Sequence, residues 1–448
     1  MKSHYQIVVL GGGESGVGAA LLAKKKGISV FVSDKNRIQQ KYRSVLEHNE
    51  IDFEDEGHSH HVILSANEVI KSPGIPDSAE LIVKIRNNKI PVISEIEFGA
   101  RYTDAKLICI TGSNGKTTTT LLTYHILKAG GLNVGIAGNI GESFAKQVAQ
   151  SEYDVYVLEI SSFQLDGMYE VVPYISILLN ITPDHLDRYD NNFKNYVESK
   201  FRIIQNQTKN EAFIYCSDDP VINNRLDIMD IKPKQYPISI QNTEVNNGAY
   251  IKNEEFIIID NKTTIKMTLE QLALQGKHNT YNSMAAGIAG KLMDIRRDTL
   301  KQCLSDFHNV AHRLEYVSSV HGISFINDSK ATNVNATWYA IEYYEKPIIW
   351  IAGGQDKGND YSQLSELVKK KVRAIVCLGE DNKPFHEAFG DSVETIVDTK
   401  SAFQAVNAAY QLAKKGDVVL LSPACASFDL FENYEDRGNQ FKTAVKEL

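Results

Sequence analysis

The chain has few cysteines, no long apolar run and no excess of positive charge. Its five cysteines include no C-x-x-C pair, so we expect neither a disulfide framework nor a cysteine metal cluster. No apolar stretch approaches the roughly 20 residues that span a bilayer, and no cationic-then-apolar leader is visible. A net charge of −8 lacks the basic footprint of a nucleic-acid-binding protein. We therefore expect a soluble cytoplasmic protein that binds neither membranes nor nucleic acids.

A glycine-rich loop opens the chain, in "VVLGGGESGVG" at residues 8–18. It lies between an apolar strand and a helix, and Gly11, Gly13 and Gly16 fit the pattern G-x-G-x-x-G. Asp34 ends the next strand, at about the distance where an acidic residue reaches a ribose. Alone, this pattern is typical of a dinucleotide site such as one for NAD. Similar turns also serve tight packing or bind other nucleotides, so the alternatives stay open.

A second glycine-rich loop occurs in "ITGSNGKTTTT" at residues 110–120. Gly115, Lys116 and Thr117 fit the end of the P-loop pattern G-x-x-x-x-G-K-[ST], although Ile110 occupies the position of its first glycine. Backbone N–H groups and a helix N-terminus would face phosphates, with Lys116 reaching the β and γ oxygens. The loop therefore predicts an ATP or GTP site, in which Thr117 can ligate Mg²⁺.

Polar residues follow the apolar strands of this second region. Glu159 ends "DVYVLEI", where a further oxygen ligand for Mg²⁺ would stand, although a solvated acid is the alternative. His185 lies in the "TPDHLDR" loop after "YISILLNI" and could be a ligand or only a hydrogen-bonding residue. Lys200, in the helix-like "NYVESKFRII", reads locally as a surface lysine. The alternating pieces from about 211 to 270 predict antiparallel hairpins attached to the sheet.

The length and the strand–loop–helix alternation predict three domains, because a single core stops growing near roughly 250–300 residues. We expect an α/β protein with an N-terminal Rossmann-like domain at 1–95 and a C-terminal Rossmann-like domain at 310–448. Between them, residues 96–309 should form a P-loop ATPase-like parallel sheet with added antiparallel strands. Open α/β sheets bind ligands at the carboxyl ends of their strands, where most of the polar motifs lie.

Eight sequence blocks together are similar to one known family. They are "TGSNGKTT", "EISSFQLD", "LNITPDHLDRY", "GKHNTYN", "HRLE", "NDSKATN", "AGGQDKG" and "LSPACASFDLFENYEDRG". In this order they resemble the Mur ligases, the ATP-dependent amide ligases of peptidoglycan synthesis, over nearly the whole chain. Within that family the resemblance is to the branch that adds D-glutamate to UDP-N-acetylmuramoyl-L-alanine. A sister ligase with another amino acid and a non-catalytic nucleotide-binding scaffold remain the alternatives.

The resemblance implies that the first loop binds the UDP of the substrate rather than NAD, and that the second binds ATP. The implied UDP-substrate contacts are Ser15, Gly16, Asp34, Pro73, Gly74, Asn139 and His185. The implied ATP contacts are Gly112, Ser113, Asn114, Gly115, Lys116, Thr117, Thr118, Asn279, Asn282, Arg313 and Asp328. The implied D-glutamate contacts are Lys330, Thr332, Lys357, Ser427, the N–H of Phe428, and Tyr434.

The resemblance also implies two Mg²⁺ ions and a modified lysine. Thr117 and Glu159 would hold the first ion, and Glu159 and His185 the second. Lys200 falls where the family carries a carbamylated lysine, whose anionic oxygens can stabilise the metal. The implied catalytic residues are therefore Lys116, Glu159, His185 and Lys200. We further expect a monomer, and domain closure during catalysis, since Arg313 and Asp328 belong to the third domain.

Overall fold

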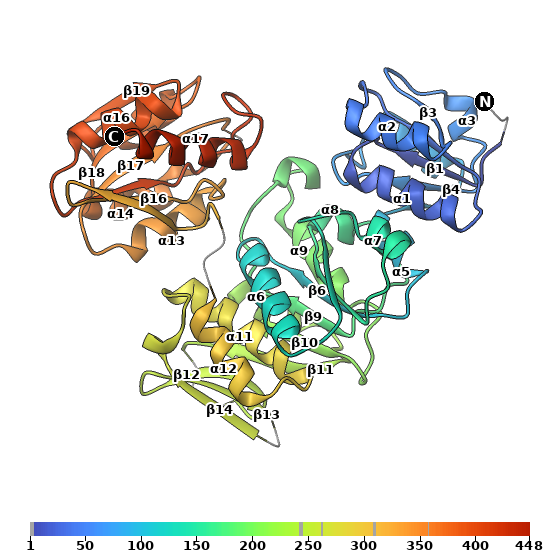
Figure 1. Ribbon diagram of the computed structural model, residues 1–448, viewed down its shortest axis with the longest axis horizontal. Helices are drawn as coiled ribbons and strands as arrows, with labels where there is room; N and C mark the ends of the chain where they lie inside the picture. Colours follow the sequence, from blue (N-terminus) through green and yellow to red (C-terminus); the bar gives the residue numbers. More distant parts are fainter. Residues whose placement is uncertain (1–3, 242–244, 261–262, 308–310, 357) are drawn as a thin grey trace. The chain divides into compact units, whose positions relative to one another are not determined.

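The structure is a computed structural model that describes residues 4–241, 245–260, 263–307, 311–356 and 358–448. In these residues three β-sheets with flanking helices form a three-domain α/β protein (Figure 1). The chain divides into two compact units, Met1–Phe307 with the first two sheets and His308–Leu448 with the third. The expected domain boundary at 95/96 stays a prediction, and the one at 309/310 falls outside the described residues.

The first sheet is parallel throughout and has the strand order β3-β2-β1-β4-β5. Its strands are β1 (Ile7–Leu10), β2 (Val30–Ser33), β3 (Asp52–Glu54), β4 (Glu68–Lys71) and β5 (Val92–Ile93). Its helices are α1 (Glu14–Lys25), α2 (Gln40–His48), α3 (His60–Ile63) and α4 (Glu80–Asn87). Strands β1 and β2 are buried over their whole length, as expected for a parallel sheet covered on both faces. The predicted Rossmann-like N-terminal domain is confirmed.

The central sheet has nine strands in the order β14-β13-β12-β11-β10-β9-β6-β8-β7. The strands are β6 (Lys106–Thr111), β7 (Val134–Gly138), β8 (Val155–Glu159), β9 (Ile175–Leu178), β10 (Ala212–Cys216), β11 (Lys234–Ser239), β12 (Gly248–Lys252), β13 (Glu255–Asp260) and β14 (Thr263–Thr268). β12, β13 and β14 form the added antiparallel part. The predicted hairpins were wrong for β10 and β11, which pair in parallel. Helix α10 (Pro220–Leu226) supplies the long crossover that a parallel pair needs.

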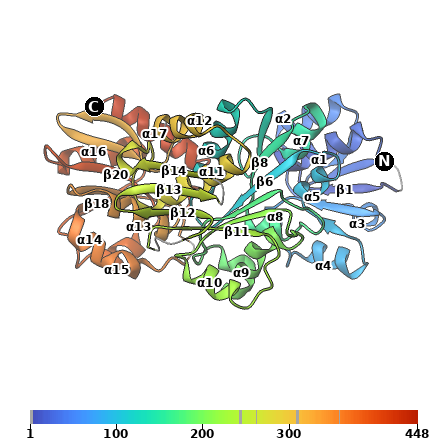
Figure 2. The same cartoon turned by 90° about the horizontal axis from the view of Figure 1, so that it is seen from below.

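Helices cover both faces of the central sheet (Figure 2). One side carries α6 (Lys116–Ala129), α11 (Lys277–Leu292) and α12 (Arg297–Asp306), and the other carries α9 (Phe193–Phe201) and α10. The shorter helices α7 (Phe144–Gln150) and α8 (Ser162–Leu165) follow β7 and β8. No helix within the described ranges has the length and apolarity that a membrane crossing requires.

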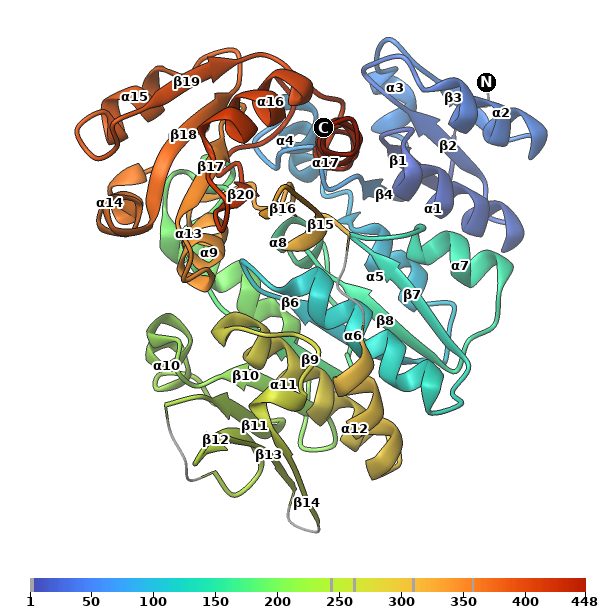
Figure 3. The same cartoon turned by 60° about the vertical axis from the view of Figure 1, so that its left-hand side comes forward.

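The third sheet has the order β15-β16-β20-β17-β18-β19, and within it only β15 runs antiparallel to its neighbour. Its strands are β15 (Glu315–Val320), β16 (Ile323–Asn327), β17 (Ile348–Ala352), β18 (Val372–Leu378), β19 (Ile396–Thr399) and β20 (Val418–Leu421). One apolar cluster packs α13 (Val334–Tyr343), α14 (Ser365–Lys371) and α15 (Lys383–Phe389) on the sheet. A second cluster packs α16 (Ala402–Leu412) and α17 (Tyr434–Lys446) on it (Figure 3).

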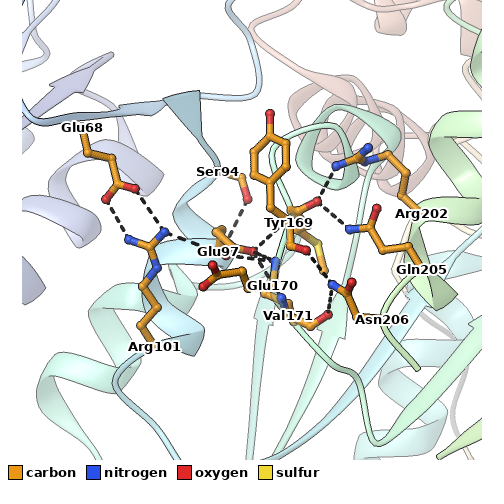
Figure 4. A network of polar contacts seen from close by, with 11 residues as sticks. Glu68, Ser94, Glu97, Arg101, Tyr169, Glu170, Val171, Arg202, Gln205 and Asn206 are labelled. Carbon is orange, nitrogen blue, oxygen red and sulfur yellow. Dashed lines mark hydrogen bonds and ion pairs between the residues drawn. The ribbon is translucent and has the colours of Figure 1, made fainter. Parts of the chain in front are cut away.

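A short helix, α5 (Glu95–Ala100), connects the first sheet to the central one. The buried Glu97 carboxylate accepts hydrogen bonds from three successive backbone N–H groups, those of residues 169–171 (Figure 4). Arg101, one residue past α5, forms two hydrogen bonds with Glu68 of β4, at 2.7 and 3.1 Å. The segment from Glu97 to Arg101 is therefore bonded to β4 of the first sheet and to the loop before β9 of the central sheet, and all of these lie in one compact unit.

Candidate active site

The P-loop joins β6 to α6 at the carboxyl end of the buried strand. Gly112 and Gly115 adopt φ values of 152° and 83°, which favour glycine. A Cβ on Gly115 would also lie 2.4 Å from Oδ1 of Asn282, so α11 packs directly against the loop. The side chain of Ser113 donates to the carbonyl of Thr182 at 2.8 Å and thereby binds the loop to the segment after β9.

Lys116 begins α6 and folds back over the loop. Its Nζ donates to the carbonyl oxygens of Gly112 at 2.8 Å and Ser113 at 2.9 Å. The side chain is thus a partly buried cation above the backbone that would face phosphate oxygens. Asn114 and Thr118 lie in the same loop and first helical turn, as predicted from the sequence.

A hydroxyl and a carboxylate meet below the P-loop. Thr117 Oγ1 donates to Glu159 Oε2 at 2.6 Å, and both residues are buried. The amide of Asn139, after β7, donates to Glu159 Oε1 at 2.9 Å. These oxygens are the hard donors that Mg²⁺ prefers, so the residues present fit a magnesium site. The structure brings the predicted first-ion pair, Thr117 and Glu159, into direct contact, and it places Asn139 beside them.

Lys200 is buried, with 1% of its surface exposed, so its local reading as a surface lysine was wrong. It lies near the end of α9, where its Nζ donates to Gly112 O at 2.8 Å and Thr111 Oγ1 at 3.3 Å. Burial, followed by the nearby positive charge of Lys116, lowers the pKa of Lys200 well below 10.5. This environment favours the neutral amine, which is the form that reacts with carbon dioxide.

His185 lies in the loop after β9 and adopts a positive φ of 53°. Its ring packs edge-on against Phe163 of α8, with the ring centroids 5.2 Å apart. Nε2 of His185 is 3.7 Å from Asp184 Oδ1. The His185 loop follows β9 and Glu159 ends β8, and these two strands pair with β6 on its opposite sides, so both follow strands next to the one that leads into the P-loop.

The first glycine-rich loop is closed by a carboxylate. Asp34 Oδ2 accepts from the N–H of Gly12 at 2.7 Å, and Oδ1 accepts from the N–H of Asn36 at 2.8 Å. A Cβ on Gly16 would lie 1.9 Å from the carbonyl oxygen of Gly11, which requires glycine where α1 meets the loop. Ser15 lies beside it in the first turn of α1.

Pro73 and Gly74 form a turn after β4 that packs against this loop. The N–H of Ile75 donates to Ser72 O at 3.1 Å, and a Cβ on Gly11 would lie 2.3 Å from Ser72 Oγ. The structure therefore brings together the two N-terminal segments that carry the predicted UDP-substrate contacts, residues 11–16 and 73–74.

Asn279 and Asn282 lie one turn apart on α11, and Asn282 Nδ2 donates to Asn279 Oδ1 at 3.2 Å. Asn282 Oδ1 also accepts from Thr119 Oγ1 of α6 at 3.2 Å. Their predicted common helix face thus lies against the helix that the P-loop caps. Both side chains are buried beside the predicted nucleotide site.

In the second unit, the predicted ATP contacts Arg313 and Asp328 interact through their charges. Burial raises the pKa of Asp328 from 3.8 to about 7, while the positive charge of Arg313 opposes this rise. Asp328 Oδ2 accepts from Ser422 Oγ at 2.9 Å, and Oδ1 accepts from the N–H of Leu314 at 3.2 Å. Asp328 therefore links the end of β16 to the end of β20.

Most of the predicted D-glutamate contacts also lie after strands of the third sheet. Nζ of Lys330 is 5.0 Å from the ring centroid of Tyr434, the first residue of α17. Thr332 follows Lys330 in the loop before α13, and Ser427 is buried next to the exposed Phe428. Lys357 lies outside the described residues.

Two arginines that the sequence interpretation did not single out organise the predicted sites. Arg437 of α17 is 1% exposed and donates to Ser329 O at 2.8 Å, to Cys425 O at 3.3 Å and to Gly353 O at 3.4 Å. It thereby joins three loops of the third sheet, and burial lowers its pKa to about 10. Its place inside the "FENYEDRG" block was the available signal. The second is Arg188, which lies in the His185 loop and donates hydrogen bonds to the Pro73–Gly74 turn.

Three protein families match successive parts of the chain. They are the MurD N-terminal domain at residues 6–81, the Mur ligase middle domain at 110–290, and the Mur ligase, glutamate ligase domain at 312–425. These ranges correspond to the three sheets.

Similar proteins match the chain along its full length. UDP-N-acetylmuramoylalanine--D-glutamate ligases of Christiangramia forsetii and Bacteroides fragilis are each 54% identical over 99% of this chain, covering 99% and 100% of their own lengths. Among solved structures, a pseudomurein peptide ligase type C from Methanothermus fervidus has a TM-score of 0.63 at 20% identity, covering 99% of both chains. A UDP-N-acetylmuramate-alanine ligase from Thermotoga maritima has a TM-score of 0.62 at 16% identity, covering 99% of this chain and 100% of its own. The solved structures support the fold alone.

Proposed function

The chain belongs to the Mur ligase family, and we propose that it is an ATP-dependent amide ligase that joins D-glutamate to UDP-N-acetylmuramoyl-L-alanine. The observation that carries this proposal is the P-loop cluster, in which Lys116, the Thr117–Glu159 pair and Lys200 converge. The choice of D-glutamate rests on the full-length identity to ligases of that name. The product is a peptidoglycan precursor.

The proposed reaction has two steps. The γ-phosphoryl group of ATP passes to the free carboxylate of the L-alanyl substrate, giving an acyl phosphate and ADP. The amine of D-glutamate then attacks the acyl carbon, which forms the amide, expels inorganic phosphate and releases a proton. Lys116 and the N-terminus of α6 would neutralise charge on the phosphate oxygens during the first step.

Magnesium is the implied cofactor, and we propose two ions. Thr117 and Glu159 would hold the first, and Glu159 and His185 the second. When bound, Mg²⁺ supplies positive charge to the phosphate oxygens. Lys200 as an ammonium would repel these ions, whereas a carbamate on its Nζ would present anionic oxygens. The neutral amine favoured by burial adds to carbon dioxide with loss of one proton, so its environment supports this modification.

The substrate contacts are proposals of the same kind. Ser15, Gly16, Asp34, Pro73 and Gly74 would bind the UDP part of the substrate, whose carboxyl end would reach Asn139 and His185. Asn279, Asn282, Arg313 and Asp328 would contact ATP. The D-glutamate carboxylates would meet Lys330, Thr332, Lys357, Ser427 and the N–H of Phe428, beside Tyr434. We also propose that the enzyme is a cytoplasmic monomer.

Phosphate release from ATP tests the function. The protein is incubated with Mg²⁺, ATP and UDP-N-acetylmuramoyl-L-alanine, with D-glutamate, L-glutamate, L-lysine, meso-diaminopimelate or glycine added separately. We expect release with D-glutamate alone and a product heavier by one glutamyl residue. Release with another amino acid would move the enzyme to a sister activity, and no release with any of them would favour a non-catalytic scaffold.

A further inference from the structure

The loop that carries His185 has a costly backbone conformation. His185, Asp190 and Asn191 adopt φ values of 53°, 55° and 54°, a region that residues with a side chain rarely occupy. Such conformations persist where surrounding contacts hold them. The contacts that hold this loop therefore decide where His185 stands.

Phe163 forms the platform for this loop. The Arg188 guanidinium carbon is 4.2 Å from the Phe163 ring centroid, while the rings of His185 and Tyr189 have centroids 5.2 and 6.0 Å from it. Phe163 is itself fixed, because α8 begins with a capping box between Ser161 and Gln164. Phe163 follows the predicted metal ligand Glu159 by only four residues, so the His185 loop packs on a residue close in the chain to that ligand.

Arg188 reaches from this platform to the turn after β4. Its two terminal nitrogens donate to Pro73 O at 3.2 Å and to Gly74 O at 3.4 Å. Within the turn, the 7%-exposed Lys71 donates to Ile75 O at 2.8 Å and lies 3.3 Å from Asp77. Lys71 thus stabilises the turn from within, and Arg188 attaches the turn to the His185 loop.

We propose that Arg188 is a positioning residue that fixes the Pro73–Gly74 turn to the His185 loop and so sets the separation between the two ends of the UDP-linked substrate's path. This inference rests on the proposed function. The planar guanidinium suits the task, because it lies over the Phe163 ring while its two terminal nitrogens donate to two successive carbonyl oxygens. Reactions that need close alignment are sensitive to errors of about 1 Å in the distance between binding and reacting groups.

The test compares Arg188→Gln and Arg188→Lys with Arg225→Gln. Arg225 is a matched control, since it also lies near an aromatic ring, that of Phe201 at 6.0 Å, and binds a side chain, Glu198, at 2.8 Å. For Arg188→Gln we expect about a tenfold rise in KM for UDP-N-acetylmuramoyl-L-alanine and a similar fall in kcat. KM for ATP and D-glutamate should stay unchanged, as should the thermal unfolding midpoint. Arg188→Lys should recover part of the loss, because it keeps the charge and one donor.

A double-mutant cycle adds a readout that simple destabilisation would not move. Phe163→Leu removes the ring on which Arg188 packs. The rise in KM for the UDP-linked substrate in the double variant should therefore be smaller than the sum of the two single effects, expressed as free energies. Additive effects, an unchanged KM for that substrate, or equal rises in all three KM values would overturn the proposal.

Calorimetry separates this inference from the proposed function. UDP-N-acetylmuramoyl-L-alanine and UDP alone serve as probes, and about tenfold weaker binding of the first to Arg188→Gln is the expected result whether or not D-glutamate-dependent phosphate release is seen. If the wild-type protein binds the substrate but releases no phosphate, the proposed function is contradicted. The role of Arg188 is then tested by the binding measurement alone. Unchanged substrate affinity in Arg188→Gln would contradict the positioning role of Arg188 and leave the proposed function unaffected. A wild-type protein that binds neither probe would overturn both.

Discussion

The two glycine-rich loops of the first unit are similar in sequence and opposite in their electrostatic surroundings. Asp34 accepts a hydrogen bond from the N–H of Gly12 in the first loop. Lys116 and Lys200 both donate to the carbonyl of Gly112 in the second. A carboxylate suits the hydroxyl and N–H donors of a nucleoside, whereas two lysine side chains suit phosphate oxygens or a modified, metal-stabilising group. A glycine pattern alone therefore predicts a turn, and the charged side chains around the turn are what distinguish these two loops.

The largest expected effect lies in the second loop. Lys116→Met should lower kcat/KM for D-glutamate-dependent phosphate release by about 1000-fold, because the transferred phosphoryl group loses its nearest cation. Lys128→Met, at the exposed end of the same helix, should remain close to wild type. Activity within tenfold of wild type in Lys116→Met would remove this lysine from catalysis.

The stability of the protein should depend on pH through Glu95, which lies near α1, the helix that follows the first loop. Glu95 accepts from Ser143 Oγ and from the N–H of Ala145, both at 2.6 Å, where α7 begins beside α1. Burial raises the pKa of Glu95 from 4.5 to about 7. Between these values the folded protein holds a proton that the unfolded chain has released, so stability should fall as pH rises from 4.5 to 7. The loss is about 3 kcal/mol at most.

Glu95→Gln should remove this contribution, since the amide oxygen can accept the same hydrogen bonds without titrating. Urea unfolding of wild type and variant at several pH values between 4.5 and 7.5 measures the difference. Glu47→Gln, which alters an exposed carboxylate on α2, is the control. Parallel stability profiles for wild type and Glu95→Gln would show that Glu95 does not carry the pH dependence.

Lys200→Ala tests the buried lysine behind the second loop. Activity should fall by about 100-fold, since the carbamate that would stabilise the metal is lost. Added short carboxylic acids, such as formate and acetate, should restore part of it by occupying the space left by the side chain. Lys194→Ala, on the exposed side of the same helix, should keep its activity. Full activity in Lys200→Ala would exclude Lys200 from the metal site.

Two glycines of the first loop should differ sharply in their tolerance of alanine. Gly16→Ala should destabilise the protein by about 2 kcal/mol, because its Cβ would lie 1.9 Å from a backbone carbonyl oxygen. Gly13→Ala meets no atom within 4 Å and should cost less than about 1 kcal/mol. Thermal unfolding measures both variants, and equal losses would contradict the tight packing at Gly16.

The smallest effect is expected where a single carboxylate oxygen changes. In Asp34→Asn one of the two N–H groups, of Gly12 or Asn36, would face an amide NH₂ group. We expect KM for the UDP-linked substrate to rise about tenfold, with KM for ATP unchanged. Steady-state kinetics with each substrate varied in turn checks this, and a rise in KM for ATP instead would reverse the assignment of the two loops.

Local sequence was sufficient to predict that Thr117 and Glu159 lie together, because each follows or ends an apolar strand. Thr117 and Glu159 end or follow adjacent apolar strands, and parallel strands bring such residues together at one sheet edge, where they lie 2.6 Å apart. The prediction failed where pairing depends on a crossover. The short apolar piece at 212–216 reads equally well as a hairpin strand, but its long connection through α10 places it in the parallel part of the sheet.

The sequence by itself determined the α/β class, the three-domain order and the positions of the two glycine-rich loops, because apolar periodicity and glycine positions act over a few residues. Only the tertiary structure decided that Lys200 is buried under the P-loop, and that Arg188 joins the His185 loop to the turn after β4. Both side chains interact with segments about 90 to 115 residues away. Burial and charge across such separations depend on how sheets and helices pack, and no local pattern records that packing.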